Sequence, residues 1–290
     1  MENTYLVTGG SSGLGYALAL ELAKTGATIV LLCKNKARGK KARVNMIAKS
    51  RNPNIDLLCY DLSDKAAVYA AAKEIKGRYS RLHLLANIAG ALYPTRQLST
   101  DGIELNFATN VVGPFLLTHL LTDLLVRTEN ARIINVSGED HRTGQIHYDD
   151  PGLSRFFTLM RAKEQVAMAR VLWTYELSRQ LRHTSVSVHT FAPGRTRTNL
   201  LRNLPLLQKL PALIANKFWA SSAKKSIQSM VPIALGNRHQ NCTGKYFYKG
   251  REEDTVPITY DTETCARFWQ LLEDHAGVQT AFYDMLESRF

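Results

Sequence analysis

The chain has 290 residues, of which 45% are hydrophobic and 21% charged, and its formal net charge is +12. That length and apolar content suffice for one large α/β domain and exclude a small disulfide-stapled scaffold or a wholly disordered chain. The positive charge raises the question of a polyanionic partner, such as nucleic acid, an anionic lipid surface or a phosphorylated ligand.

Four widely separated cysteines indicate a reducing compartment. Cys33, Cys59, Cys242 and Cys265 show no C-x-x-C spacing, and no histidine stands at zinc-like spacing beside them. We therefore expect free thiols in a cytoplasmic protein, without a disulfide framework or a metal site. The sequence opens on a short apolar run and a glycine-rich turn. We expect neither a signal peptide nor a transmembrane segment, and no apolar run long enough to span a bilayer.

Short apolar runs alternate with amphipathic stretches along the chain. The runs that predict strands are Tyr5–Val7, Thr28–Cys33, Asn54–Cys59, Leu82–Ala86, Arg132–Val136, Ser185–Phe191 and Gly244–Tyr248. The helices expected among them include Gly13–Lys24, Asp101–Arg127 and Phe156–Leu181. This alternation predicts an α/β fold in which a doubly wound parallel sheet of Rossmann type is covered by helices on both faces, in a single domain over residues 1–290.

Two segments break the alternation. Asp140–Ser154 is polar and rich in turn residues, whereas Asn199–Trp219 is rich in leucine and contains two prolines. Both follow strands at the edge where doubly wound sheets bind ligands, so both are candidates for substrate walls. We predict that 199–219 forms a lid over a large apolar substrate. Peripheral membrane contact, assisted by Lys209 and Lys217, is the alternative.

A glycine-rich turn, Thr8–Gly15, lies between the first predicted strand and the first predicted helix. Glycines let the backbone approach a pyrophosphate closely, and the helix N-terminus supplies free N–H groups and the positive end of a dipole. The turn therefore predicts a dinucleotide site. The contacts that we expect from it are Gly9, Ser11, Ser12, Gly13, Leu14 and Gly15.

The end of the second predicted strand indicates which dinucleotide binds. A site for NAD usually has an acidic residue there, which bonds the ribose hydroxyls. Here the strand ends Cys33-Lys34 and a run of cations follows, from Lys36 to Arg43. We therefore predict NADP(H), with Lys34 contacting its 2′-phosphate, whereas a solvated basic helix face is the alternative. This local account, and the lack of interleaved aromatic residues, argues against nucleic acid as a partner.

A series of motifs resembles those of the short-chain dehydrogenase/reductase superfamily, and in particular its retinol-dehydrogenase-like branch. The turn Thr8–Gly15 resembles the family signature T-G-x-x-x-G-x-G. The other similar segments are Asp61-Leu62, Asn87-Ile88-Ala89-Gly90, Asn110, Pro193-Gly194-Arg195-Thr196-Arg197-Thr198, Gly244-Lys245-Tyr246-Phe247 and Ala266-Arg267-Phe268-Trp269. The resemblance covers nearly the whole chain. It implies further cofactor contacts from Asp61, Leu62, Asn87, Ala89, Gly90, Pro193, Gly194, Thr196 and Thr198.

The resemblance breaks at the residues that transfer the proton. The family uses a Ser that orients the carbonyl, a Tyr that exchanges the proton, and a Lys that lowers the pKa of that tyrosine and holds the nicotinamide ribose. Aligning the end of the fifth strand and the following helix places these positions on Gly138, Lys163 and Ala167. Asn110 alone remains of the family's catalytic tetrad, so ordinary carbonyl reduction by the family mechanism is not expected.

Three further side chains join Asn110 as catalytic candidates. A desolvated Lys163 would act as a proton donor or base, or would reach back about 5.4 Å, one helical turn, to the ribose. A lysine that merely extends its ammonium to solvent is the alternative. His141 and Asp140 follow the fifth strand at the mouth of the expected site. A histidine suits acid–base work near neutrality, although the resemblance favours a structural role for this one.

These observations leave several functions open. The first is an atypical NADP(H)-dependent oxidoreductase that acts on a bulky apolar small molecule, such as an iminium or a conjugated system, which needs little help from an enzyme acid. The second is a non-redox cyclase or isomerase that reuses the pocket, and the third is a non-catalytic NADP(H) sensor. The retained nucleotide motifs favour the first. In many relatives the helices that correspond to 101–127 and 156–181 form a dimer bundle. The resemblance therefore also raises the question of a homodimer.

Overall fold

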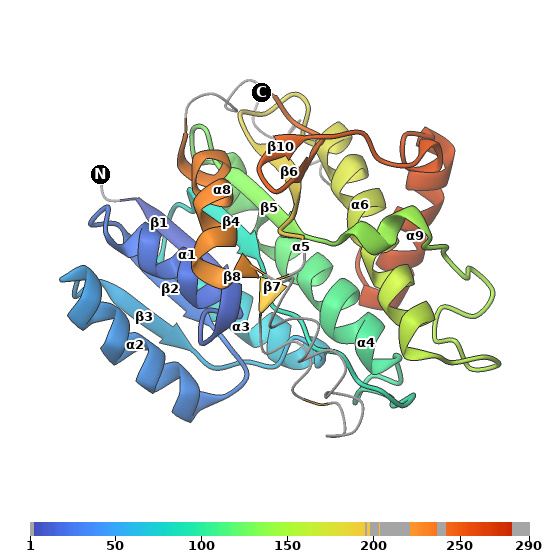
Figure 1. Ribbon diagram of the computed structural model, residues 1–290, viewed down its shortest axis with the longest axis horizontal. Helices are drawn as coiled ribbons and strands as arrows, with labels where there is room; N and C mark the ends of the chain where they lie inside the picture. Colours follow the sequence, from blue (N-terminus) through green and yellow to red (C-terminus); the bar gives the residue numbers. More distant parts are fainter. Residues whose placement is uncertain (1–2, 195, 198–202, 204–220, 237–241, 280–290) are drawn as a thin grey trace.

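One mostly parallel sheet runs through the molecule between two layers of helices (Figure 1). The computed structural model describes residues 3–194, 196–197, 203, 221–236 and 242–279. Within these residues the sheet has eight strands, and its neighbouring pairs are parallel apart from β9 and β10. In spatial order the strands are β10 (Arg251–Glu252), β9 (Lys245–Tyr248), β6 (Ser187–Ala192), β5 (Arg132–Val136), β4 (Leu84–Asn87), β1 (Thr4–Thr8), β2 (Thr28–Leu32) and β3 (Ile55–Leu58). The predicted doubly wound parallel sheet of Rossmann type is confirmed.

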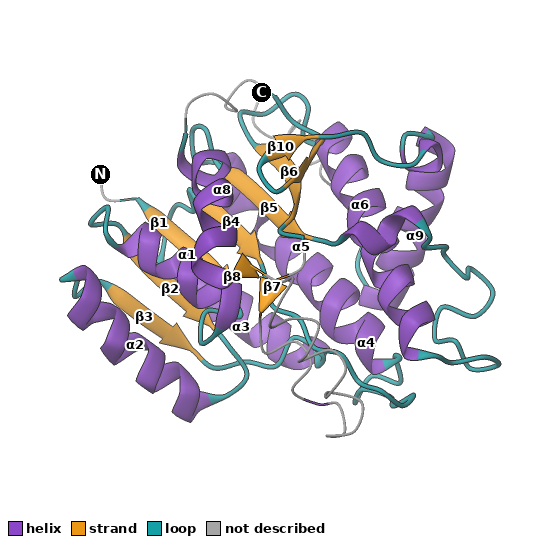
Figure 2. Cartoon of the chain, in the orientation of Figure 1, coloured by secondary structure: helices purple, strands orange, loops and turns teal. Residues whose placement is uncertain are grey.

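Helices cover both faces of the sheet, as Figure 2 shows in purple on either side of the orange strands. Successive residues of a strand point to opposite faces, so Leu6 joins one apolar core whereas Val7 joins the other. The core that includes Val7 packs against α1 (Gly13–Ala23), α2 (Lys36–Ser50) and α8 (Ala223–Leu235). The core that includes Leu6 packs against α3 (Lys65–Arg78), α5 (Gly113–Val126), α6 (Leu159–Gln180) and α9 (Thr262–Ala276).

The observed strands match the predicted runs to within about two residues, and the differences have local causes. The fourth strand begins at Leu84 rather than Leu82, because the amide of Leu82 donates to the Thr128 hydroxyl (3.0 Å) instead of to a neighbouring strand. Strand β10 carries no apolar signal, since both of its residues are charged and exposed. A small pair outside the main sheet joins β7 (Thr196–Arg197) to β8 (Ser221–Ser222).

The helix predicted at Asp101–Arg127 begins later and is interrupted. Gly102 has φ +75°, and the buried carboxylate of Glu104 caps the first turn by accepting from the amides of Asn106 and Phe107. The helical path then runs through α4 (Leu105–Phe107), the π-helical turn η1 (Ala108–Val112) and α5. The π-turn places Asn110 where the chain approaches the end of β4.

The same stretch corrects an expectation from the sequence. By length and apolar composition, Leu105–Val126 could cross a bilayer, so the prediction that no run reaches that length was wrong. In the structure 78% of its window is buried inside the protein, where it forms the core against α3, α6 and α9. Packing within the fold therefore accounts for its apolar character.

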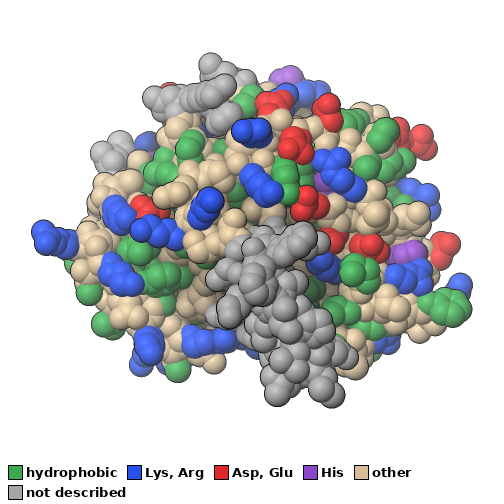
Figure 3. Space-filling view, in the orientation of Figure 1, with side chains coloured by type: hydrophobic (Ala, Val, Ile, Leu, Met, Phe, Trp, Pro, Cys, Tyr) green, Lys and Arg blue, Asp and Glu red, His purple; other side chains and the backbone are tan. Residues whose placement is uncertain are grey.

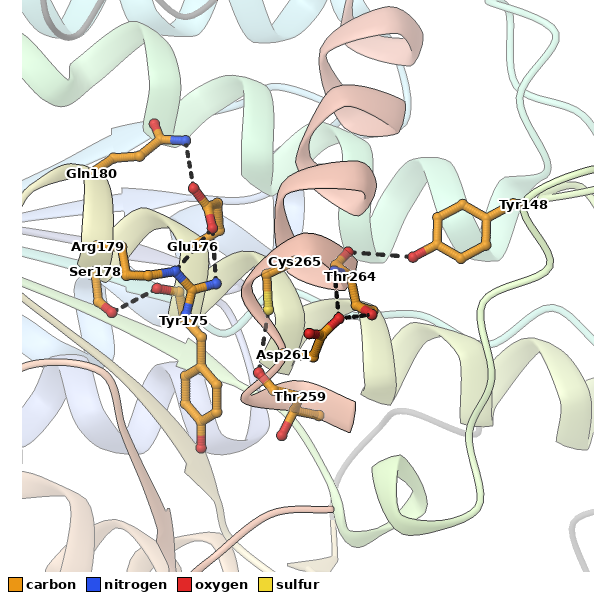
Figure 4. Close-up of polar contacts among 10 residues, drawn as sticks. All are labelled: Tyr148, Tyr175, Glu176, Ser178, Arg179, Gln180, Thr259, Asp261, Thr264 and Cys265. Atoms are coloured by element: carbon orange, nitrogen blue, oxygen red, sulfur yellow. Dashed lines mark hydrogen bonds and ion pairs between the residues drawn. The ribbon is translucent and has the colours of Figure 1, made fainter. Parts of the chain in front are cut away.

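Helix α9 packs against α6, and Figure 4 shows the polar contacts at one end of this interface. Tyr148 and Tyr175 lie apart there, on either side of the start of α9. The Tyr148 hydroxyl donates to the Thr264 carbonyl at 3.4 Å, and the Tyr175 hydroxyl bonds Thr255 at 3.0 Å. The Cys265 thiol bonds the carbonyl of Thr259, at the end of the short 3-10 turn η5 (Pro257–Thr259), at 3.2 Å. Tyr148 therefore links the loop before α6 to α9, and Tyr175 links α6 to the segment before η5.

Candidate functional site

A cavity of about 1140 Å³ opens at the carboxyl edge of the sheet. Its walls come from the segments that follow β1 to β6 and from one face of α6. The strand order reverses between β1 and β4, and this switch point is where doubly wound sheets bind ligands. Most of the predicted site residues line the cavity. They are Gly9, Ser11, Ser12, Gly13, Leu14, Gly15, Lys34, Asp61, Leu62, Ala89, Gly90, Asn110, Asp140, Lys163, Pro193, Gly194 and Thr196.

The structure does not bring every predicted residue to this cavity. Asn87 and His141 are buried outside its lining. The amide of Asn87 instead donates to the Thr118 hydroxyl (2.9 Å) and the Asn135 side chain (2.8 Å) in the core. Thr198 lies outside the described residues, and so does the predicted lid 199–219 apart from Asn203.

The glycine-rich turn is built to bring main chain close to a ligand. Gly9 has φ +71°, and a Cβ there would lie 2.9 Å from the Cα of Ala89. The Thr8 hydroxyl accepts from the amide of Ala89 at 2.9 Å, which ties the turn to the end of β4. Ser12 precedes α1 without forming a side-chain cap, so the first N–H groups of that helix lack this partner. Such a helix start is a site for the pyrophosphate of a dinucleotide.

Basic side chains surround the end of β2. Lys34 forms an ion pair with Asp61, with the two charged atoms 2.6 Å apart. Burial acts to raise the pKa of Asp61, but hydrogen bonds from Lys34 and Ser63 outweigh it and hold that pKa below its ordinary value. A smaller cavity of about 310 Å³ adjoins the first. It shares Ser11, Ser12 and Arg38 with the first cavity and adds Tyr16, Lys41, Ala42, Asn45 and Lys49.

Helix α2 supplies most of this positive charge. Figure 3 shows blue side chains spread over the part of the face where α2 lies in Figure 1, with few red ones among them. Its sequence contains Lys and Arg but neither Asp nor Glu. Arg43 is turned to the fold, since its Nε donates to the Ile55 carbonyl at 2.5 Å. Of the α2 cations, Arg38 lines both cavities, whereas Lys41 and Lys49 line the smaller one.

The amide of Asn110 is fully engaged within the fold. Its Oδ1 accepts from the amide of Ala91 (3.0 Å), and its Nδ2 donates to the carbonyls of Ala91 (2.8 Å) and Asn106 (2.7 Å). These bonds hold the loop after β4 against the π-turn η1. The side chain that the resemblance identifies as catalytic therefore acts here as a brace for the cavity wall.

Lys163 and Asp140 meet at the cavity. The Lys163 ammonium donates to Oδ1 of Asp140 at 2.8 Å, and the two side chains are 37% and 30% exposed. Asp140 comes from the 3-10 turn η2 (Glu139–Arg142) that follows β5, and Lys163 comes from the second turn of α6. The pair differs from the predicted desolvated lysine in an apolar pocket. The carboxylate of Asp140 neutralises the charge of the lysine at the cavity wall.

Gly138 and Ala167 also line the cavity, and neither side chain can transfer a proton. The neighbouring Ser137 donates its hydroxyl to the Ala167 carbonyl at 2.9 Å. Among the described residues, the tyrosines of the lining are Tyr60, whose hydroxyl donates to Glu74 at 2.6 Å, and Tyr93.

His141 belongs to η2, and its side chain packs against β9. It is 0% exposed, and its ring lies 4.7 Å from that of Tyr246. Its Nδ1 bonds the carbonyl of Gly138 at 2.8 Å. Burial lowers the pKa of His141, which favours the neutral ring. This environment is that of a structural histidine. Within the described part of the chain, no group of three or more His, Cys, Asp or Glu side chains could hold a metal ion.

Sequence reasoning missed Arg170. This residue is 8% exposed and lines the cavity from α6. Its Nε donates to the carbonyl of Asn110 at 2.8 Å, its Nη2 to that of Ala89 at 2.9 Å, and its Nη1 to that of Val136. Burial lowers the pKa of this guanidinium to about 10, so it stays charged at neutral pH.

A signal for Arg170 was present in the sequence. The cavity-facing residues of α6 recur every three or four positions, at Met160, Lys163, Ala167 and Arg170, which is one face of a helix. Arg170 also stands alone among apolar neighbours, in the run 168–172. A charged residue in such a run is buried or functional more often than a charge on a solvated face.

The comparisons with known proteins agree with this geometry. Residues 3–150 match the family model for short chain dehydrogenase. The chain is 30% identical over 277 residues to retinol dehydrogenase 12 from Bos taurus, a match that covers 94% of this chain and 86% of the relative. It is 31% identical over 271 residues to retinol dehydrogenase 13 from Homo sapiens, covering 92% and 82%.

A solved structure has a similar fold. It is a short chain dehydrogenase from Burkholderia cenocepacia in complex with NADP, and it matches with a TM-score of 0.67 at 21% identity, covering 85% of this chain and 95% of that one. The family model covers β1 to β5 with the glycine-rich turn, and each of these two relatives covers more than nine-tenths of the chain. The chain therefore belongs to the short chain dehydrogenase family of oxidoreductases, which binds nicotinamide cofactors.

Proposed function

We propose that this chain is an NADP(H)-binding oxidoreductase that acts on a bulky apolar small molecule without the family's Ser-Tyr-Lys set. The observation that carries the proposal is the composition of the cavity. Its nucleotide side keeps the glycine-rich turn, whereas the positions that the resemblance assigns to Ser, Tyr and Lys hold Gly138, Lys163 and Ala167.

The residues present fit a dinucleotide phosphate. The uncapped start of α1 and the backbone of Gly9 and Gly13 would hold the pyrophosphate. The basic wall at the end of β2 would hold the 2′-phosphate. Arg38 is the preferred contact there, because Lys34 is already paired with Asp61. A bound nicotinamide cofactor supplies a hydride donor or acceptor. The NADP complex of a protein with a similar fold supports this choice of cofactor.

The far wall of the cavity suits an apolar substrate. Leu92, Leu159, Met160 and Val166 line it, and Met160 is 56% exposed toward solvent. Burying apolar substrate atoms against such side chains contributes about 25 cal/mol per Å². The names of the relatives, retinol dehydrogenases, identify an apolar alcohol as their substrate and support the same class here.

The cavity lacks the hydroxyl and the phenol of the family mechanism but has the ion pair of Lys163 and Asp140, and this combination favours a particular class of substrate. No hydroxyl at position 138 orients a carbonyl, and no phenol at position 163 exchanges a proton. A substrate that already carries positive charge, or that delocalises negative charge by conjugation, needs least help from an acid. Lys163 itself occupies the second of these positions. Its ammonium offers a hydrogen-bond donor to a conjugated carbonyl, and the carboxylate of its partner Asp140 offers a negative charge to a cationic substrate.

A second candidate, a non-redox cyclase or isomerase, is favoured by that same ion pair. An ammonium and a carboxylate 2.8 Å apart at the cavity wall are groups that can deliver and accept a proton without redox chemistry. In that case a bound dinucleotide would be structural. A non-catalytic NADP(H) sensor is the third possibility.

One labelling experiment separates these functions. The protein is incubated with NADPH deuterated at C4 and a panel of apolar iminium and conjugated carbonyl acceptors, and products are analysed by mass spectrometry. We expect deuterium in the product with matching loss of NADPH absorbance. Lys163→Met should lower the rate at least about tenfold, because it removes a charged donor, while Lys73→Met on exposed α3 should not.

The other outcomes are equally specific. Product that contains no deuterium, formed without loss of NADPH, would assign the cyclase or isomerase function. Tight NADPH binding with neither product nor oxidation across the panel would favour the sensor.

A further inference from the structure

Arg170 is a buried cation whose charge no acid neutralises. Among the described side chains, no carboxylate forms an ion pair with it, and its bonds go to the main-chain carbonyls of Ala89, Asn110 and Val136. A buried charge without a counter-ion is costly, and carbonyl dipoles compensate it only in part. The guanidinium also has N–H groups beyond those three bonds, and the residue lines the cavity.

Lys163, the other cation on the cavity face of α6, does have a counter-ion. Lys163 lies two turns earlier and is paired with Asp140. Of these two cations, only Arg170 has no carboxylate partner among the described side chains. A ligand with electronegative oxygen atoms would balance its charge.

The position of Arg170 indicates which part of a dinucleotide it would meet. The basic wall for the 2′-phosphate lies at β2, and the turn for the pyrophosphate lies at β1. A dinucleotide crosses the switch point, so its second half lies over the ends of β4 and β5. Arg170 binds the carbonyl of Ala89 just after β4 and that of Val136 at the end of β5.

Ala167 leaves room for this contact. It lies three residues before Arg170, on the same helical face, and it also lines the cavity. A methyl side chain cannot bond a sugar hydroxyl. The planar guanidinium one turn later can, because its parallel N–H groups match two neighbouring oxygen atoms.

We propose that Arg170 is a cofactor-binding residue whose guanidinium holds the hydroxyls of the ribose next to the nicotinamide. This inference rests on the proposed NADP(H) site and takes it further. A fixed positive charge beside the nicotinamide repels the cationic oxidised ring and not the neutral reduced ring, so the site should bind NADPH more tightly than NADP⁺.

The test uses ligands that share one half of the cofactor. NADPH, NADP⁺ and 2′,5′-ADP are titrated into the full chain by calorimetry. Because 2′,5′-ADP contains the 2′-phosphate, which we assign to the basic wall at the end of β2, but no second ribose, its affinity reports on the adenosine half of the cofactor alone. We expect Arg170→Met to weaken NADPH about 10- to 100-fold, the range for a charge-assisted hydrogen bond, and to change 2′,5′-ADP less than about twofold.

Two further variants separate contact from general damage. Arg132 is a matched control, because it is 4% exposed and its guanidinium bonds the carbonyl of Ile233 at 3.0 Å, outside the cavity lining. Arg132→Met should lower the thermal midpoint without changing the ratio of NADPH to 2′,5′-ADP affinity. Ala167→Lys combined with Arg170→Met returns a cation one turn earlier and should restore most of that ratio.

An unchanged ratio in Arg170→Met would overturn the proposal and leave Arg170 as a brace of the cavity floor. If that variant does not fold, Arg170→Lys provides the same comparison, since it keeps the charge and loses the planar fork. There too an unchanged ratio overturns the proposal and a lowered one supports it. Failure of the wild-type chain to bind either NADPH or 2′,5′-ADP would instead refute the proposed function.

Discussion

At the scale of single residues, the choice between NADP(H) and NAD(H) depends on a few cations at the end of β2. Lys34 was the expected contact, but its ammonium lies 2.6 Å from Asp61. Arg38 has no carboxylate in ion-pair contact among the described residues, and it lines both adjoining cavities. A guanidinium in this place matches a phosphate by paired hydrogen bonds.

We therefore expect Arg38→Ala to raise the dissociation constant for NADPH about tenfold or more and to leave that for NADH nearly unchanged, because NADH has no 2′-phosphate. Quenching of intrinsic tryptophan fluorescence measures both. Lys40→Ala is the control, since Lys40 is an exposed α2 cation outside both cavities. Equal losses for NADPH and NADH would contradict this assignment.

The same residues show what a sequence can and cannot predict about a site. The glycine-rich turn, which the sequence predicts to bind a dinucleotide, lies at the cavity, and Gly9 and Gly13 have the positive φ values that glycine favours. The pairing of Lys163 with Asp140 was not predicted, since the two are 23 positions apart and meet only after α6 has packed against β5. The main-chain carbonyls that Arg170 bonds leave no pattern in a sequence, so only its isolated charge in the apolar run 168–172 indicated it.

At the scale of elements, strands were easier to predict than the path of the α4–η1–α5 segment. Buried strands such as β1 and β2 place apolar residues on both faces, and continuous apolar runs reveal them. The π-turn η1 has no such signature. The Asn110 amide stabilises it by bonding Ala91 from another segment, so the turn depends on tertiary structure.

This gives an expectation for Asn110. Asn110→Ala removes the three bonds of the amide and leaves the main-chain groups of Ala91 without their buried partner. We expect a loss of about 1–3 kcal/mol in the free energy of unfolding, measured with urea. Hydrogen exchange should be accelerated first at 89–93 and 106–112, the two segments that the amide joins.

A matched variant makes the result specific to the brace. Asn110→Asp keeps the acceptor for the Ala91 amide but sets a buried carboxylate against the carbonyls of Ala91 and Asn106, so exchange in these two segments should be faster than in Asn110→Ala. Uniform acceleration over the whole chain, with no excess in these two segments, would contradict the assigned role.

At the scale of the whole molecule, the net charge of +12 has a partial explanation. Helix α2 concentrates six Lys and Arg residues beside the cavity, within a segment that has no acid. The remaining excess is distributed over the chain. The fold class followed from the sequence because the alternation of strands and helices extends over almost its whole length, whereas the antiparallel edge strand β10 has no apolar residue to reveal it.

Buried and half-buried histidines affect how the stability of the whole molecule depends on pH. Burial is the largest cause that lowers the pKa of His83, His119, His141 and His275 below the ordinary value of 6.5. Above that pH both folded and unfolded chains carry neutral rings. As the pH falls below 6.5, the unfolded chain takes up protons that the folded chain does not. This proton uptake stabilises the unfolded state relative to the folded state.

We therefore expect the free energy of unfolding to fall between pH 7 and pH 5, as measured by urea denaturation at several pH values. Carboxylates do not account for this window, because the lowered pKa of Asp61 starts from an ordinary value of 3.8 and contributes only at more acidic pH. His141→Asn keeps a donor for the Gly138 carbonyl and removes the titrating ring, so the slope should become shallower. His183→Asn at an exposed site is the control. A slope that stays the same in His141→Asn would show that another group causes the loss.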